Sequence, residues 1–151
     1  MPNEIERKFL VRGEFKPYAT SAHTITQGYL CRSPLRCVRV RLIDDKAALT
    51  IKGPSSNDGL TRFEWEKSIS PDDAHQLLQI CEPGIIKKIR YRVPFQNHCF
   101  EVDEFDGNLK GLILAELELQ NENEPFERPD WLGDEVTGDP KYYNAALSSL
   151  A

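Results

Sequence analysis

The chain has 151 residues, of which 40% are apolar and 28% charged, and its net charge is −5 at pH 7. This length suits one domain with a sizeable core, so we expect a single domain over residues 1–151. The acidic balance argues against a nucleic-acid partner, although it leaves room for a local basic cavity. No segment approaches the roughly 20 apolar residues of a membrane span, and the first residues lack an export signal. We therefore expect a cytoplasmic protein that does not bind membranes.

The chain opens on a charged stretch, Glu4-Ile5-Glu6-Arg7-Lys8, that alternates like a strand. A period of two places Glu4, Glu6 and Lys8 on one face and Ile5 and Arg7 on the other. Seven further strands are expected over residues 24–32, 36–43, 47–52, 61–69, 85–93, 98–105 and 112–119, most of them with one apolar and one charged face. Several of these strands are joined by short turns.

Two helices and one long loop complete the expected elements. Ser70 as N-cap, followed by Pro71 and two acidic residues, predicts the start of a helix. Apolar residues at positions 74, 77, 78 and 81 then form one stripe, which needs an apolar surface to cover. Residues 142–150 are expected to form a short closing helix, and residues 121–138 an ordered loop around Trp131.

The polar faces of the strands share a composition, since hardly any Ser, Thr or Gln occurs among them. They comprise Glu4, Glu6, Lys8, Arg39, Arg41, Lys52, Arg62, Glu64, Glu66, Lys88, Arg90, Glu101, Asp103, Glu116 and Glu118. About eight strands can close into a barrel. If the apolar faces pack outward against the helix stripe, the charged faces line a wet lumen. The expected fold is therefore α+β, a closed eight-stranded barrel with a charged lumen and a few helices outside.

A lumen lined by both signs of charge restricts its ligand. Arg and Lys side chains suit phosphate oxygens, which accept hydrogen bonds from the guanidinium fork and from the ammonium group. Clustered carboxylates would repel such an anion unless a divalent cation lay between them, and hard oxygen ligands favour Mg²⁺ or Mn²⁺. The composition of the lumen therefore predicts a metal–polyphosphate complex as the ligand.

Several of these charged residues stand in ordered motifs, of which the first is E-x-E-x-K at residues 4–8. The others are Gln27-Gly28-Tyr29-Leu30, Val38-Arg39-Val40-Arg41-Leu42, Thr50-Ile51-Lys52, Arg62-Phe63-Glu64-Trp65-Glu66, Lys88-Ile89-Arg90-Tyr91, Glu101-Val102-Asp103 and Glu116-Leu117-Glu118. In this combination the chain resembles the CYTH domain, or triphosphate tunnel metalloenzyme, family. The segment Glu135-Val136-Thr137-Gly138-Asp139, with Tyr142 and Asn144 after it, is most similar to short bacterial members that hydrolyse inorganic triphosphate.

The resemblance implies an eight-stranded antiparallel tunnel and a role for each charged residue. Glu4, Glu6, Glu116 and Glu118 would bind the metal, with Asp103 at a second metal ion. The phosphate-binding residues would be Lys8, Arg39, Arg41, Lys52, Arg62, Lys88 and Arg90, and the catalytic residues Lys8, Glu6 and Asp103. Glu64, Glu66 and Glu101 would either join the metal ligands or hold the arginines in place.

The function that the resemblance implies is hydrolysis of the terminal phosphate of inorganic triphosphate with Mg²⁺ or Mn²⁺, and weaker hydrolysis of nucleoside triphosphates. The basic residues would hold the anion in line, while the metal ions neutralise its oxygens and activate water. Two alternatives stay open: an adenylyl cyclase that makes cyclic AMP from ATP, and a polyphosphate-binding module without turnover. The resemblance also suggests a homodimer, because several relatives form one.

Overall fold

The structure is a computed structural model that describes residues 3–151. Within that range the elements are β1 (Asn3–Val11), η1 (Lys16–Tyr18), β2 (Ser21–Cys31), β3 (Cys37–Ile43), β4 (Lys46–Ser55), β5 (Thr61–Ile69), α1 (Pro71–Gln79), β6 (Ile86–Phe95), β7 (His98–Phe105), η2 (Gly107–Leu109), β8 (Ile113–Glu118), β9 (Leu132–Glu135), η3 (Pro140–Tyr142) and α2 (Asn144–Ser148). No helix within it is long and apolar enough to cross a membrane.

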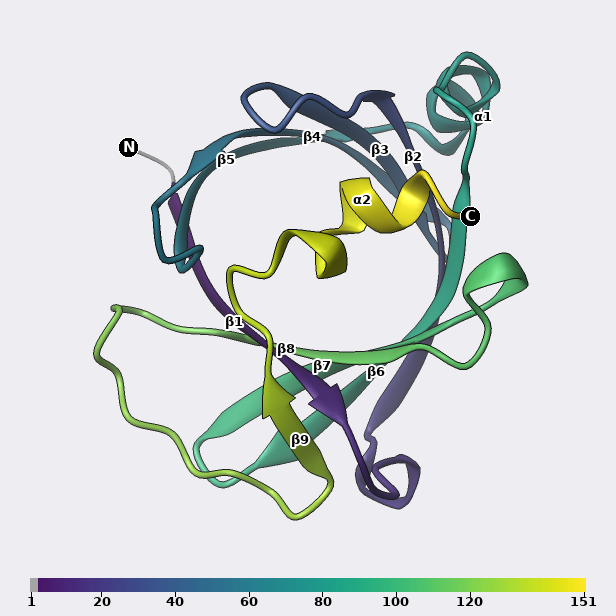
Figure 1. Cartoon of the computed structure of the whole chain (residues 1–151). Helices are drawn as coiled ribbons and strands as arrows, with labels where there is room; N and C mark the ends of the chain where they lie inside the picture. Colours follow the sequence, from purple (N-terminus) through teal and green to yellow (C-terminus); the bar gives the residue numbers. More distant parts are fainter. Residues whose placement is uncertain (1–2) are drawn as a thin grey trace.

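Eight of the strands close into an antiparallel barrel, which Figure 1 shows along its axis. The strand order is β5-β4-β3-β2-β6-β7-β8-β1, and the first residues of β1 return to β5. Asn3 lies opposite Phe63 and Ile5 opposite Thr61, and this pairing closes the ring. The expected closed eight-stranded barrel is therefore confirmed.

The expectation of a loop over the whole of residues 121–138 is wrong, because a ninth strand, β9, lies within it. β5 pairs with only the first residues of β1, so the far half of that edge needs another partner. β9 supplies it, with Glu135 opposite Phe9 and Leu132 opposite Val11. The sequence Leu-Gly-Asp-Glu is too short to show an alternating pattern.

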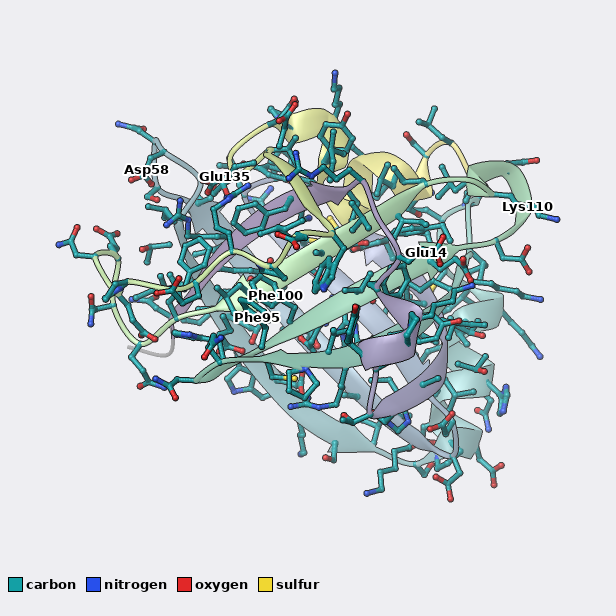
Figure 2. All side chains as sticks on the ribbon, turned by 90° about the horizontal axis from the view of Figure 1, so that it is seen from below. Glu14, Asp58, Phe95, Phe100, Lys110 and Glu135 are labelled. Carbon is teal, nitrogen blue, oxygen red and sulfur yellow. The ribbon has the colours of Figure 1, made fainter. Side chains whose placement is uncertain are left out.

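Much of the outer face of the barrel is apolar and covered, although Trp65 of β5 and Ile89 of β6 are exposed. Ser70 Oγ accepts a hydrogen bond from the Asp73 amide at 3.0 Å, which confirms the predicted N-cap of α1. The helix packs its buried Ala74 and the neighbouring stripe over Val40 of β3. On the opposite side of the barrel, Trp131 packs against Phe100, labelled in Figure 2, together with Phe9 and Phe15. The charged faces are therefore left to point inward.

The C-terminal segment crosses one opening of the ring, where Figure 1 shows α2 in front of the lumen. The predicted helix over residues 142–150 is shorter in the structure, because Tyr143 is extended (φ −68°, ψ 139°) and separates η3 from α2. Leu147 of α2 is buried with Ile86, Phe105 and Leu114. We call these four residues the apolar plug. Ile86, Phe105 and Leu114 lie on the inward faces of β6, β7 and β8, in line with the charged residues of those strands. The apolar plug therefore fills one end of the lumen.

Gly84 fixes the position of the plug. Its φ is +102°, and a Cβ atom built there would lie 1.8 Å from the carbonyl oxygen of Ser148. The Ser148 hydroxyl donates a hydrogen bond to the Gly84 carbonyl oxygen at 2.5 Å, and Ser148 is fully buried. A side chain at position 84 would therefore displace α2 from its packing against Gly84.

Gly84→Ala should destabilise the fold more than Gly111→Ala. Gly111 has nearly the same φ, +100°, but a Cβ built there has no atom of the described residues within 4 Å. Both variants carry the backbone cost of positive φ, about 1–2 kcal/mol, and only Gly84→Ala adds overpacking, about 1–3 kcal/mol. Urea unfolding of the three proteins measures the difference. Equal midpoints for the two variants would contradict the close packing of α2 on Gly84.

Candidate active site

Strand alternation brings the charged residues predicted from the sequence to one lumen. Cross-strand register places Lys8 opposite Glu116, Arg90 opposite Asp103 and Lys52 opposite Glu64. The seven basic side chains are Lys8, Arg39, Arg41, Lys52, Arg62, Lys88 and Arg90, and the eight acidic ones are Glu4, Glu6, Glu64, Glu66, Glu101, Asp103, Glu116 and Glu118. Opposite charges are therefore neighbours across four of the eight barrel strand pairs, which partly offsets the cost of burying them, whereas Glu6 lies opposite Glu118 and Glu101 opposite Glu116.

Asp103 forms the most buried ion pairs of the lumen, with Lys88 and Arg90. Its Oδ2 atom lies 2.7 Å from Lys88 Nζ, and the guanidinium of Arg90 grips both carboxylate oxygens at 2.8 and 2.9 Å. Burial raises the pKa of Asp103, but the two cations outweigh it and the net pKa is lowered. Burial also lowers the pKa of Lys88 to about 8, although Asp103 opposes this shift. Asp103 thus uses both oxygens to hold two cations in place.

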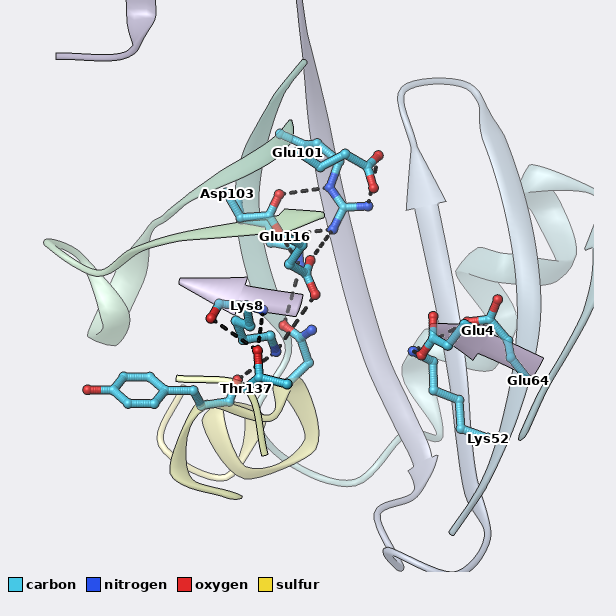
Figure 3. A network of polar contacts seen from close by, with 12 residues as sticks. Glu4, Lys8, Lys52, Glu64, Glu101, Asp103, Glu116 and Thr137 are labelled. Carbon is cyan, nitrogen blue, oxygen red and sulfur yellow. Dashed lines mark hydrogen bonds and ion pairs between the residues drawn. The ribbon is translucent and has the colours of Figure 1, made fainter. Parts of the chain in front are cut away.

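Glu116 connects this group to the first strand, as Figure 3 shows. Arg90 Nη2 donates to Glu116 Oε1 at 3.1 Å, and Lys8 Nζ lies 3.7 Å from Glu116 Oε2. Although burial raises the pKa of Glu116, Lys8 and Arg90 hold it well below its usual value. The C-terminal segment also reaches the lysines, since Lys8 Nζ donates to the Tyr142 carbonyl at 2.9 Å and Lys88 Nζ to Asn144 Oδ1 at 3.3 Å.

A second group of charges joins β1, β4 and β5, and appears on the other side of Figure 3. Lys52 Nζ lies 2.6 Å from Glu4 Oε1 and 3.3 Å from Glu64 Oε2. Burial raises the pKa of Glu6 well above its usual value, and repulsion from Glu116 and Glu4 raises it further. Glu6 therefore tends to keep its proton unless positive charge comes close to it.

The wall formed by β2 and β3 differs because some of its nitrogens lack partners. Arg39 Nη2 donates to Thr50 Oγ1 at 3.3 Å, but the buried Nε atoms of Arg39 and Arg41 have no hydrogen-bond partner among residues 3–151. Burial, with repulsion from Arg39 and Arg90, lowers the pKa of Arg41 to about 10. Arg62 is turned to the backbone, where its Nε donates to the Gly53 carbonyl at 2.7 Å. This wall presents cationic donors to the lumen.

Carboxylate oxygens are suitable ligands for a hard divalent cation, but among the described residues they are not arranged around a common point. Over residues 3–151, no three His, Cys, Asp or Glu side chains converge as the ligands of a metal ion would. Lys52 occupies the space between Glu4 and Glu64, with Nζ within 3.3 Å of both. The crowding that raises the pKa of Glu6 would nevertheless be relieved by a cation among these oxygens, which are the ligands Mg²⁺ and Mn²⁺ prefer.

A cavity opens between the charged lumen and the C-terminal segment. Its lining includes Glu4, Glu6, Lys8, Arg39, Lys52, Arg62 and Glu116 among the predicted site residues. Arg41, Lys88, Arg90 and Asp103 lie in the lumen but outside this lining, and Glu118 lies at an exposed position opposite Glu6. Most of the predicted residues are thus brought together in one lumen, with Glu66 and Glu118 at exposed positions, and only some of them face this cavity.

Sequence reasoning gave no site role to several groups that complete the site, although Thr50, Thr137 and Asn144 belong to the segments that carry the family resemblance. Cys37, Thr137 and Asn144 line the cavity, and Thr50 bridges Arg39 and Glu66 with a 2.9 Å hydrogen bond to the latter. Thr50 could have been found by its alternation with Lys52. The carbonyl of Tyr142 carries no side-chain signal, and Thr137 and Asn144 come from a segment without periodicity.

The chain is similar to several known proteins over nearly its whole length. The model of the CYTH domain family matches residues 2–143. A protein from Acetivibrio thermocellus named inorganic triphosphatase is 43% identical over 148 residues, which are 97% of this chain and 94% of that protein. A protein of the same name from Nitrosomonas europaea is 36% identical over 151 residues, which cover 96% of each chain.

A solved structure described as an inorganic triphosphatase has the same fold, with a TM-score of 0.65 and 33% identity over 96% of this chain and 97% of that one. The family model and the two relatives each span nearly the whole sequence. The chain therefore belongs to the CYTH domain family.

Proposed function

We propose that the protein is a metal-dependent triphosphatase that cleaves the terminal phosphate of inorganic triphosphate. One observation carries this proposal: the buried Nε atoms of Arg39 and Arg41 on β3 have no hydrogen-bond partner within residues 3–151, in a lumen to which β1, β7 and β8 contribute carboxylates. Buried donors of this kind call for an anion. The names of the two relatives, which are 43% and 36% identical, support the choice of inorganic triphosphate.

The basic residues bind and orient the substrate. Arg39 and Arg41 offer unpaired nitrogens, and Lys8 projects between Glu116 and the C-terminal segment. Asp103 acts through Lys88 and Arg90, since it fixes both cations by short contacts of 2.7 to 2.9 Å. Phosphoryl transfer needs mainly positioning and electrostatic stabilisation, which is what fixed cations in a buried lumen provide. Lys8 is the proposed proton-transfer residue.

The proposed metal ligands are Glu4, Glu6, Glu116 and Glu118, and the metal is Mg²⁺ or Mn²⁺. When bound, the metal would neutralise phosphate oxygens and lower the pKa of a coordinated water. The metal role of Asp103 also stays a prediction, because Lys88 and Arg90 already take both of its oxygens. The cytoplasmic location and the homodimer stay predictions as well.

A substrate panel tests the proposed function. The purified protein is incubated with inorganic triphosphate, pyrophosphate, ATP, GTP and thiamine triphosphate, each with Mg²⁺ or Mn²⁺. We expect fastest turnover of inorganic triphosphate, with orthophosphate and pyrophosphate as products. Cyclic AMP from ATP without release of orthophosphate from triphosphate would instead identify a cyclase. Saturable binding of triphosphate without any product would identify a binding module.

Glu6→Gln should lower metal-dependent activity about 100-fold or more without destabilising the metal-free protein. Glu6 has a folded-state pKa above its usual 4.5, so its ionisation opposes folding increasingly as pH rises above that value. Protonated Glu6 is hydrogen-bonded to Glu116. Glutamine removes the negative charge of Glu6 but keeps an N–H group that can donate to Glu116. Thermal unfolding of the metal-free protein at pH 7 should therefore show an equal or higher midpoint. Full turnover by the variant would refute the assigned role.

Arg41→Gln should weaken triphosphate binding about tenfold, because it removes a charged donor from the unpaired wall. The folded-state pKa of Arg41 is about 10, below its usual 12.5. At pH 7 the charge is therefore disfavoured in the fold, so the ligand-free variant should be no less stable than the wild type. Arg36→Gln, at an exposed position just before β3, is the matched control and should leave KM unchanged. Equal KM values for all three proteins would remove Arg41 from the site.

A further inference from the structure

Gln27 has a free amide in the interior of the barrel. It lies on β2 and is 0% exposed, yet neither Oε1 nor Nε2 has a hydrogen-bond partner in the part of the chain that the structure describes. Its neighbour Gly28 faces outward, because a Cβ there would lie 2.6 Å from Ile85 Cδ1 and 3.0 Å from Cys81 Sγ. Alternation therefore turns Gln27 inward. A buried amide without partners costs about 1–3 kcal/mol, so an incoming polar group that pairs with it recovers that free energy.

The register places this amide between the cationic wall and the apolar plug. Gln27 lies opposite Arg41 of β3 and opposite Ile86 of β6, which belongs to the plug. The charged and titratable groups that share its inward face nearby are Arg39, Arg41, Lys88 and Tyr29, from β3, β6 and β2. A phosphate group held here would meet the closed end of the lumen. It must then be a terminal phosphate without a substituent.

The chemistry of the amide differs from that of the surrounding acceptors. The neutral acceptors of the C-terminal segment are engaged, since the Tyr142 carbonyl accepts from Lys8 and Asn144 Oδ1 from Lys88. The nearby cations are partly compensated, with Arg41 at 3.9 Å from Glu66 and Lys88 at 2.7 Å from Asp103. A phosphate that kept one proton would bring less uncompensated negative charge. A neutral carbonyl oxygen can accept a hydrogen bond from that proton.

We propose that Gln27 binds the terminal phosphate of the substrate in its protonated form, with Nε2 donating to a bare oxygen and Oε1 accepting from the P–OH group. This inference rests on the proposed function for the identity of the substrate. It adds a residue that selects one protonation state of inorganic triphosphate. The geometry also orients the substrate, because the selected phosphate faces the apolar plug.

Proton uptake on binding tests this role directly. Calorimetric titration of the metal-free protein with inorganic triphosphate, in buffers of different ionisation enthalpy, gives the number of protons taken up. At a pH where the free ligand has lost its last proton, the wild type should take up about one proton more than Gln27→Met. Lys88 contributes in both proteins, so its share cancels in the difference. The variant should also bind about tenfold more weakly at lower pH.

Two further variants make the outcome unambiguous. Thr26→Val, which changes the outward-facing neighbour on the same strand, should retain the wild-type proton count and affinity. Gln27→Asn keeps the amide but draws it back from the lumen by one methylene, so it should also lose the extra proton and bind more weakly, even if Gln27→Met fails to fold. Equal proton counts for wild type and Gln27→Met would overturn the proposal and leave the amide to a buried water. An unchanged proton count in Gln27→Asn would overturn it as well.

The measurement also separates the two proposals. If the wild type releases no orthophosphate from triphosphate in the substrate panel, the proposed function fails, but the proton count still reports on Gln27. If turnover is normal and the proton count does not depend on Gln27, the inference fails alone.

Discussion

The pairing of opposite charges inside the barrel is the constraint on which the rest of the structure depends. A buried charge is costly unless a partner takes up its hydrogen bonds. Asp103 meets this requirement for Lys88 and Arg90, and Arg90 extends the chain of contacts to Glu116 at 3.1 Å. Because seven basic side chains face eight acidic ones, the lumen is close to neutral before any ligand binds. A triphosphate anion in it therefore calls for added positive charge, from a divalent cation or a proton.

The inward direction of these charges follows from what covers the outside. α1 packs on Val40 and its neighbours, and Trp131 with Phe15 covers the aromatic outer face on the other side. If the barrel were turned inside out, these apolar faces would have to fill the interior and the helix stripe would meet water. The hydrophobic effect therefore orients the strands, and ion pairing makes the resulting lumen tolerable.

Strand alternation made the barrel and most of its lumen predictable from sequence, since a period of two assigns every second residue to one face. Arg39, Lys88 and Glu116 were placed correctly by this rule alone. β9 was missed because four residues carry too little pattern, and its existence depends on an edge of β1 that only closure of the barrel leaves free. The ion-pair partner of each charge could not be predicted from sequence either. The same alternation is compatible with an Asp103 that binds a metal ion and with an Asp103 that is paired with Lys88 and Arg90.

The C-terminal segment shows why fold and site are not separable in this protein. Leu147 seals the apolar end of the lumen, while a few residues earlier the Tyr142 carbonyl and Asn144 accept hydrogen bonds from Lys8 and Lys88. The same stretch thus excludes water from one end and sets the direction of two lysines. Lys88 also lies 2.7 Å from Asp103, and Lys8 lies 3.7 Å from Glu116, so each ammonium group is held between a carboxylate and the C-terminal segment. Hydrophobic packing at one end of the barrel therefore helps to set the direction of two positive charges that a phosphate in its middle would meet.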